Sequence, residues 1–448
     1  MVELALIGWV PLALLLFATL PRGRAALAGV IIATLFLPMG SIAIGGLPDY
    51  DKSNATAVGL LLAVIVFDHG RMGRFRFSRL DLPMLVFCAA PFMTSQLNGL
   101  GIYDGCSSVA LQVLRFGIPY FVGRLYCTTP QDLRDLAVGL VLGGLIYMPL
   151  CLWEVRMSPQ LHAQVYGFQQ HKFGQTRRFG GFRPTVFMQH GIMVGIWMTL
   201  TTMTSLWLWR AGDLRRLFGL PMGLLIIGMV VTCVLCKSLG ALLLLVGGVV
   251  LLFLTVYLRT RALVILLALL PSAYISSRVL GWTGESAVWV IETYIDPARA
   301  QSMGARFGYE ETQLEHVSTR PFFGWGRWGR DRPRGEPGQI ITITDSMWVL
   351  LMGQFGLIGM GAYFLTLTVP VFVTAFRLES SQLASRAAAP VLCLAVVLGI
   401  YAADKLLNGM PNPVFMFLAG GLNAFWLSGG LGGEGAAEGA DASAAVTV

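Results

Sequence analysis

Long uninterrupted apolar runs decide which folds are open to this chain. The runs at 241–258, and at 391–401 with its flanks, are long enough for helices of about 20 residues to cross a hydrocarbon core about 30 Å thick. In lipid a segment must satisfy its own backbone hydrogen bonds, so only helices and closed β-barrels span a membrane. Barrel strands alternate polar and apolar residues, whereas these runs are apolar on every face. The sequence therefore predicts an all-α, polytopic integral membrane protein.

The number of apolar runs sets the size of the membrane domain. Of 448 residues, 55% are hydrophobic and 12% are charged, whereas soluble domains carry about 25% charged residues. We predict 12–14 membrane-spanning helices in a single domain, 1–428, and a disordered cytoplasmic tail, 429–448, that is rich in Gly and Ala. Thirteen candidate spans can be delimited, at 2–20, 25–45, 55–67, 82–97, 105–123, 135–153, 187–209, 217–235, 240–258, 262–277, 345–376, 388–406 and 413–428.

Basic residues fall in alternate short connections between these spans. Cytoplasmic loops carry an excess of Lys and Arg, so the arginine-rich connections are assigned to the cytoplasm. The opposite short connections hold only Lys52, Lys237 and Lys405, and the two long loops, 154–186 and 279–344, then lie outside. The net charge of +8 reflects topology and contact with anionic lipid, and it requires no nucleic-acid partner. The assigned cytoplasmic arginines are Arg22, Arg24, Arg71, Arg74, Arg76, Arg79, Arg124, Arg134, Arg210, Arg215, Arg216, Arg259, Arg261, Arg377 and Arg386.

The second long loop combines arginines with aromatic residues. Phe307, Leu314 and Val317 recur at helical spacing among glutamates, which predicts a short amphipathic helix on the membrane surface, from near Gly304 to just before Pro321. The next segment, FFGWGRWGRDRPRGEPG, offers glycine turns between aromatic and guanidinium groups. A loop of this kind in a membrane protein is where we expect the chemistry. Its arginines include Arg299, Arg306, Arg320, Arg327, Arg330, Arg332 and Arg334.

Short motifs in and around this loop follow one another in a set order. Arg306 leads the predicted helix, 320–326 reads RPFFGWG, and 356–359 reads GLIG. Earlier, 177–191 reads RRFGGFRPTVFMQHG, and CKSLGALLLL begins at Cys236. In order, spacing and placement on one membrane face, these motifs resemble those of the O-antigen ligase and Wzy-type O-antigen polymerase superfamily. The resemblance covers roughly 175–365, and the N-terminal half is similar only in hydropathy.

The resemblance implies glycan transfer from a polyprenyl-diphosphate donor to a glycan acceptor, at the periplasmic face of a bacterial inner membrane. No cofactor is implied, and chain-length regulators and export proteins are further candidate partners beside membrane lipid. The superfamily places a His-Asn pair eleven residues before the GLIG-like step, where this chain has Asp345 and Ser346. It also commonly has Arg where this chain has Leu239.

Arginine suits a lipid-linked diphosphate because its planar, permanently charged guanidinium binds phosphate oxygens in pairs. Arg177, Arg178, Arg183 and Arg306 are therefore our candidates for holding the donor, with Arg178 and Arg306 assigned catalytic roles. As the diphosphate leaves it gains negative charge, so guanidinium groups there stabilise the transition state more than the ground state. Arg177 and Arg178 could alternatively be interface anchors.

The acceptor hydroxyl needs a general base, and Asp345 is our candidate at the position where the superfamily has histidine. His316, His171 and His190 are alternatives, although each could instead be an ordinary surface or helix-end residue. Asp345 could also simply cap the helix that follows it. His316 is further assigned to substrate binding.

Trp325 and Trp328 are candidates for stacking on sugar rings, although an aromatic belt at the membrane surface would use the same residues. No DxD, HxH or HExxH pattern occurs in the outer loops, which predicts a metal-independent enzyme. Three other readings stay open at this point. The acceptor could be lipid A core, as in a ligase; the chain could transport lipid-linked glycan; or it could be a structural membrane subunit.

Overall fold

The structure, a computed structural model, describes residues 1–178, 180–336, 339–342 and 345–432 and confirms an all-α architecture. Within these residues, eight helical segments are long and apolar enough to cross a membrane, which makes the chain a multi-pass membrane protein. They are α1 (Val2–Thr19), α3 (Lys52–Gly73), the 3-10 turn Arg79–Asp81 with α4 (Leu82–Leu97), α7 (Pro130–Met157), α9 (Gly191–Arg210), α11 (Leu239–Tyr257), α12 (Ala262–Val279) and α15 (Met347–Arg377).

Shorter helices complete the bundle, so that each of the thirteen predicted spans overlaps a helix. That the chain crosses the membrane 12–14 times stays a prediction. The additional bundle helices are α2 (Arg22–Phe36), α5 (Gly101–Gln112), the π-helical Val113–Gly117, α6 (Ile118–Tyr126), α10 (Met222–Leu235), α16 (Ala389–Asp404) and α17 (Pro413–Leu427). The remaining elements are α8 (Leu161–Tyr166), α13 (Glu285–Tyr294), α14 (Pro297–Val317), the hairpins β1–β2 (Ser41–Ile42 and Tyr50–Asp51), β3–β4 (Arg177–Arg178 and Gly181–Phe182) and β5–β6 (Arg216–Leu217 and Leu220–Pro221), and the 3-10 turns Phe173–Thr176 and Gly430–Gly432.

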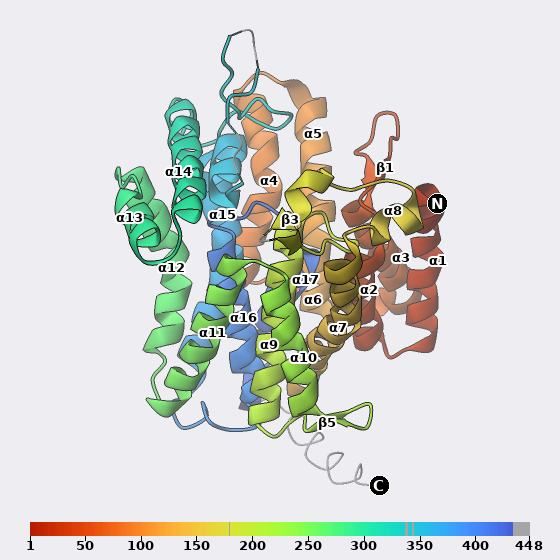
Figure 1. The fold of residues 1–448 in the computed structure, drawn as a ribbon. Helices are drawn as coiled ribbons and strands as arrows, with labels where there is room; N and C mark the ends of the chain where they lie inside the picture. Colours follow the sequence, from red (N-terminus) through yellow and green to blue (C-terminus); the bar gives the residue numbers. More distant parts are fainter. Residues whose placement is uncertain (179, 337–338, 343–344, 433–448) are drawn as a thin grey trace.

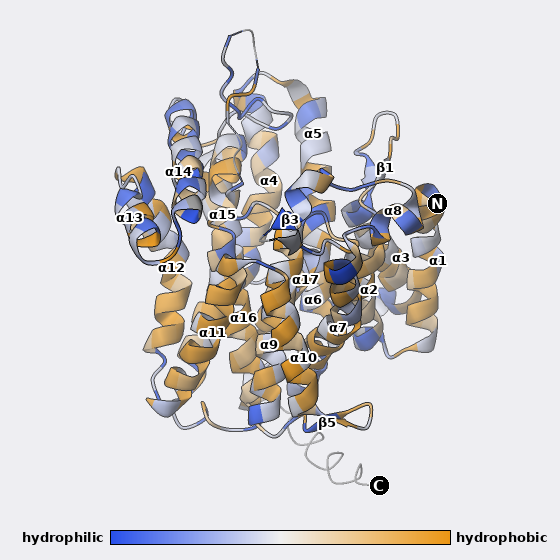
Figure 2. Ribbon diagram, viewed as in Figure 1, coloured by the Kyte–Doolittle hydropathy of each residue, from blue (hydrophilic) through white to orange (hydrophobic). Residues whose placement is uncertain are grey.

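The arginine-rich short connections meet at one end of the bundle, which we call the basic end. Asp213 accepts hydrogen bonds from Arg134 and Arg386, at 2.9 and 3.4 Å, and thereby ties three connections together. Arg24 pairs with Asp135 at 2.6 Å. Figure 1 shows β5 at this end, and β3, α8, α13 and α14 at the opposite end, which we call the loop end. In Figure 2 hydrophobic residues cover α9 to α12 towards the basic end, while hydrophilic residues concentrate on α13 and α14.

The centre of the bundle contains two helices, α16 and α17, that are shorter than the predicted spans 388–406 and 413–428. All of α16 is buried, and nearly all of α17. Glycines allow α17 to lie directly against α6: a Cβ on Gly123 would fall 2.0 Å from the Phe417 carbonyl oxygen, and a Cβ on Gly420 would fall 2.0 Å from that of Tyr120. Small residues at such crossings let helix backbones approach closely in a membrane protein.

The amphipathic helix of the second long loop is longer than predicted and packs differently. It begins at Pro297, where the Asp296 side chain accepts a hydrogen bond from the Arg299 N–H, and not near Gly304. Its periodic residues Phe307 and Val317 are buried against other parts of the protein. The prediction that this apolar face lies on the membrane surface was therefore wrong. The pattern of a surface helix and that of a helix docked on protein are the same in sequence.

Two further boundaries differ from the prediction. Helix α7 continues to Met157, so the first long loop begins later than 154, and it contains α8. Gly430 to Gly432 form a 3-10 turn, with Gly430 close to the Trp426 ring, so the order of the chain extends past 428. The rest of the predicted tail, 433–448, lies outside the described residues, as do 337–338 and 343–344 of the second long loop.

Candidate functional site

Helix α15 is broken at Gly356, and the turn 320–326 docks into the break. Gly356 has φ 63°, and beyond it the Leu357 N–H donates to the Pro321 carbonyl at 2.7 Å. In the reverse direction the Trp325 N–H donates to the Gly353 carbonyl at 2.8 Å. A Cβ on Gly356 would lie 2.2 Å from the carbonyl carbon of Phe322, so only glycine fits. The RPFFGWG and GLIG motifs are therefore the two halves of one structural unit.

Helix α4 holds the same turn from the other side. The Thr94 hydroxyl donates to the Phe323 carbonyl at 2.6 Å, and the Asn98 amide donates to the Gly324 carbonyl at 2.9 Å. A Cβ on Gly324 would fall 2.5 Å from the Gly353 carbonyl oxygen. Backbone carbonyls that would otherwise be unpaired at this depth are thus satisfied by side chains of a neighbouring helix. The turn 320–326 is thus held on one side by α4 and on the other by α15.

A buried ion pair docks α14 onto the ends of α12 and α15. Glu310 of α14 lies 3.3 Å from Arg278 of α12, and both side chains are only 1% exposed. Glu310 also accepts hydrogen bonds from the hydroxyls of Ser346 and Tyr274. Burial raises the pKa of Glu310, and these hydrogen bonds together with the charge of Arg278 act in the opposite direction.

This docking brings together two of the predicted catalytic residues. Arg306 lies one helical turn before Glu310, and Asp345 directly precedes Ser346. A guanidinium nitrogen of Arg306 consequently lies 3.8 Å from the Asp345 carboxylate, whose side chain is 43% exposed. The N-cap of α15 is Ser346, so capping is not the role of Asp345. An exposed carboxylate beside a guanidinium is available to a substrate.

Arginines of the first long loop form a cationic cluster with α14. Arg183 is 8% exposed and donates to the Lys237 carbonyl at 2.8 Å, and Lys237 donates to the Arg178 carbonyl at 2.9 Å. Burial lowers the pKa of Arg183 to about 10, and the next largest cause is the charge of Arg178, with Arg306 acting in the same direction. Arg183 stays protonated at neutral pH. We call Arg178, Arg183, Arg299 and Arg306 the arginine cluster.

Arg177, the fourth donor candidate, is placed differently from its neighbour. Successive residues of a strand face opposite sides, and the Arg177 guanidinium lies over the Phe173 ring, 5.9 Å from its centre. Its exposed side chain is compatible with the alternative of an interface anchor. Of the two adjacent arginines, Arg178 is the one whose charge acts on Arg183.

His190 lies beside the arginine cluster but is not free to act as a base. It is the N-cap of α9, and its Nδ1 accepts the Ile192 N–H at 3.1 Å. The neutral ring must therefore carry its proton on Nε2. Burial lowers the pKa of His190 to about 4, and the nearby charges of His171, Arg183, Arg178 and Arg306 act in the same direction. His190 therefore has the alternative role, that of an ordinary residue that hydrogen-bonds the end of a helix. Asp345 remains the candidate base.

The predicted substrate-binding residues His316 and Trp325 pack on each other. Their rings are stacked at 4.7 Å and 11°, and the Arg320 guanidinium lies over Trp325 at 4.0 Å. His316 follows Arg306 by ten residues on α14, which separates them by about 15 Å along the helix axis. The structure therefore places these two rings away from the Arg306–Asp345 pair. Their mutual stacking fixes the turn that follows α14.

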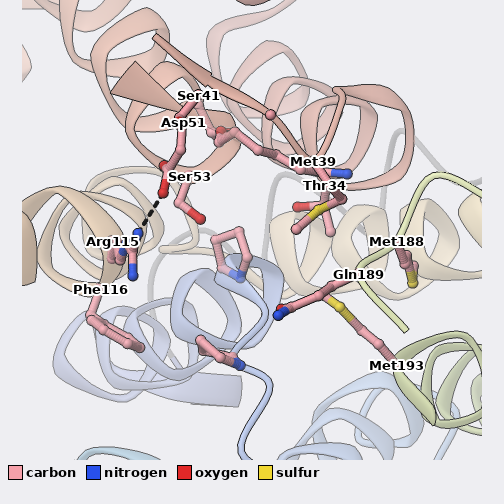
Figure 3. A pocket seen from close by; sticks show the side chains of 15 residues that line it. Thr34, Met39, Ser41, Asp51, Ser53, Arg115, Phe116, Met188, Gln189 and Met193 are labelled. Carbon is pink, nitrogen blue, oxygen red and sulfur yellow. Dashed lines mark hydrogen bonds and ion pairs between the residues drawn. The ribbon is translucent and has the colours of Figure 1, made fainter. Parts of the chain in front are cut away.

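A cavity of about 390 Å³ opens among the helix ends at the loop end. Figure 3 shows Asp51 and Arg115 on one side, joined by an ion pair, with Gln189 and Met193 on the other side. We call it the central cavity. The sequence analysis did not predict this cavity. The charge of Arg115 inside the predicted span 105–123 was a usable signal, but its partner Asp51 lies 64 residues earlier, in a hairpin.

A second cavity, of about 270 Å³, shares Ser41, Asp51 and Arg115 with the first. It adds Trp328, which is 65% exposed and has φ 67°, together with Arg327. We call it the outer cavity. The predicted residue Trp328 therefore lines a cavity, whereas Trp325 serves in packing.

No protein-family model matches the sequence, and comparison with curated proteins finds no significant match. What this chain does must be inferred from its own residues. Those that the structure gathers at the loop end are the arginine cluster, Asp345 and the lining residues of the two neighbouring cavities.

Proposed function

We propose that this protein is a membrane glycosyltransferase that polymerises polyprenyl-diphosphate-linked oligosaccharide repeat units into a surface polysaccharide. The observation that carries the proposal is the meeting of Arg306 with Asp345, at 3.8 Å, beside the arginines of the first long loop. A permanent cation for a diphosphate and an exposed carboxylate for a hydroxyl are the two groups that such a transfer needs.

The proposed location is a bacterial inner membrane, crossed 12–14 times, with the loop end in the periplasm. The gathering of arginine-rich short connections at the basic end supports this orientation, because cytoplasmic connections carry the excess of Lys and Arg. Chain-length regulators and export proteins are the partners we would expect for such an enzyme. A lipid-linked donor diffuses in the plane of the membrane and would present its diphosphate to the arginine cluster.

In the proposed reaction, Arg178, Arg183 and Arg306 hold the donor diphosphate. Asp345 takes the proton of the acceptor hydroxyl as its oxygen bonds to the sugar carbon that carries the diphosphate. The bond from that carbon to the diphosphate oxygen breaks, and the diphosphate leaves with the electron pair. The arginines stabilise the added negative charge on the leaving group, a contribution of about 3 kcal/mol for a well-placed donor.

A ligase that transfers glycan to lipid A core would use the same two groups with a different acceptor. The absence of the His-Asn pair at 345–346 led us to prefer the polymerase. A transporter of lipid-linked glycan would need the arginines but no base. The role of the Asp345 carboxylate therefore separates transfer from transport.

The test uses the purified protein in proteoliposomes with a lipid-linked repeat unit, and product length is read on a gel. We expect R306A and D345N each to lower the transfer rate about 100-fold, with R306K intermediate because lysine lacks the paired donors. R334A, an exposed arginine of the same loop, is the matched control and should keep full activity. Full activity of D345N would overturn the proposal, and donor movement across the bilayer without product would indicate transport.

A further inference from the structure

The central cavity adjoins the arginine cluster through one short segment of chain. Met188 and Gln189 line the cavity, and the next residue, His190, lies in the electric field of Arg183 and Arg306. The segment is held by Glu154, whose carboxylate accepts the N–H groups of two successive residues, 185 and 186, at 2.7 Å each. The cavity and the cluster therefore lie on either side of a fixed stretch of backbone.

A second segment separates the cavity from Asp345. Pro411 and Pro413 line the cavity, and a Cβ on nearby Gly409 would fall 2.7 Å from the Asp345 carbonyl oxygen. The Met347 N–H donates to the Lys405 carbonyl at 3.1 Å and ties the start of α15 to the same segment. The segment 405–413 thus contacts the backbone at the candidate base and also lines the cavity. A molecule in the cavity is separated from Asp345 by this one stretch of chain.

The central cavity contains a buried amine that can donate to a ligand. Lys52 lines it and is 9% exposed. Its ammonium donates to the Phe187 carbonyl at 2.9 Å, which uses one of three N–H donors. Within the described residues no carboxylate lies at ion-pair distance from Lys52, and the neighbouring Asp51 pairs with Arg115. The remaining N–H groups of Lys52 can donate to a ligand, and a negatively charged group would be the strongest acceptor and would stabilise the protonated amine.

The outer cavity lies beside the central cavity. It shares the Asp51–Arg115 pair with the central cavity and is also lined by Trp328, whose ring is exposed. Arg115 and Arg327 both line the outer cavity with their guanidinium-bearing side chains. An exposed aromatic face beside guanidinium groups suits sugar rings and their hydroxyl groups.

We propose that the central and outer cavities, which share Asp51 and Arg115, bind the acceptor glycan, and that the sugar nearest Lys52 carries a carboxylate. This inference rests on the proposed function, which requires a glycan acceptor. The acceptor would then be an acidic glycan such as one that contains a uronic acid. Its carboxylate pairs with the ammonium of Lys52, while its outer rings lie against Trp328.

The test measures binding of a glucuronic-acid-containing trisaccharide, and of its carboxyl-reduced counterpart, to the full chain in nanodiscs by calorimetry. Wild-type protein should bind the acidic trisaccharide at least about ten-fold more tightly, because only it pairs with the buried amine. K52M should remove this preference, and K172A, at an exposed lysine of the loop end, should keep it. Equal affinity of the wild-type protein for both trisaccharides, or a preference that persists in K52M, would overturn the proposal.

A second variant covers the case in which K52M does not fold. W328A changes an exposed ring, so the fold should survive, and it should weaken both trisaccharides about five-fold or more while keeping the preference for the acidic one. Unchanged binding by W328A would show that the outer cavity is not part of the site. If wild-type protein transfers glycan, loses transfer in R306A and shows no carboxylate preference, this inference fails and the proposed function stands. If the preference is present but no transfer occurs, the proposed function fails and the acidic-glycan site remains.

Discussion

Arg278 of α12 and Glu310 of α14 form an ion pair, 3.3 Å apart, from which water is almost fully excluded. Because Glu310 also accepts the Ser346 hydroxyl, the same carboxylate joins α14 to the start of α15. Arg306 lies one helical turn before Glu310, and Asp345 lies one residue before Ser346. The buried pair therefore sets the position of the exposed pair at which we place the chemistry.

The substitution E310Q tests this relationship. It leaves the Arg278 charge buried without its partner, and removing one member of a buried pair costs on the order of 3–5 kcal/mol. We expect a lower unfolding temperature in detergent and a fall in the rate of transfer. E315Q, an exposed glutamate of the same helix, should change neither. An E310Q protein as stable and as active as wild type would show that the pair does not position Arg306.

The break in α15 predicts opposite effects for two glycines of the same helix. G356A places a Cβ against the backbone of 322 and forces a positive φ on alanine, so we expect the turn 320–326 to undock and activity to be lost. G361A is the matched control, because a Cβ there meets no atom within 4 Å. Alanine favours helix over glycine by about 1 kcal/mol, so G361A should be neutral or slightly stabilising. Limited proteolysis of the second long loop, with thermal unfolding, measures both effects.

His190 predicts a loss of stability in weak acid. Its pKa is about 4 in the folded protein and about 6.5 when unfolded, so between these values the unfolded state binds the additional proton. Stability is therefore fully present above about pH 6.5 and falls as the pH is lowered towards 4. H190N keeps an N-cap side chain but does not titrate.

The measurement is the unfolding temperature of both proteins from pH 7.5 to pH 4.5. The wild-type curve should fall more steeply than that of H190N, because carboxylate titration is common to both. Parallel curves would contradict the assignment of a neutral, buried His190 among Arg178, Arg183 and Arg306.

Transfer should survive chelation of divalent cations. In the proposed reaction guanidinium groups, and not a metal ion, neutralise the departing diphosphate. The rate of transfer in proteoliposomes should be unchanged by EDTA. The R306A variant, which lacks one of the guanidinium groups, should transfer slowly whether or not magnesium is added. Abolition of transfer by EDTA and its recovery with magnesium would refute a mechanism that relies on arginine alone.

The sequence predicted correctly those features of the fold that produce a pattern among residues close together in the chain. A lipid environment demands continuous apolar helices, so the all-α membrane class could be predicted from runs such as 241–258, which the structure places in α11. Glycines with a positive φ are also visible locally, and Gly356 belongs to a motif that the sequence analysis singled out. Asp345 and Arg306 were located by their resemblance to the motifs of a superfamily, and the structure places their side chains 3.8 Å apart.

Other features depend on residues that are distant in sequence and could not be derived from periodicity. The amphipathic pattern of α14 does not reveal whether lipid or protein covers its apolar face, and the Arg278–Glu310 pair decides it. His316 and Trp325 had suitable chemistry for a substrate, but tertiary packing turns them towards each other.

The apolar runs alone are enough to predict that most of this chain lies in lipid as helices, because exposing backbone polar groups to lipid costs too much free energy for most other structures. The arginines and the carboxylate can also be read directly from the sequence. Which of these charges share a site follows only from the folded arrangement, because Coulomb energies depend on distance in space and on burial. That arrangement placed Arg178 and Arg183 with Arg306, neutralised Arg115 with Asp51 and left Lys52 facing a cavity.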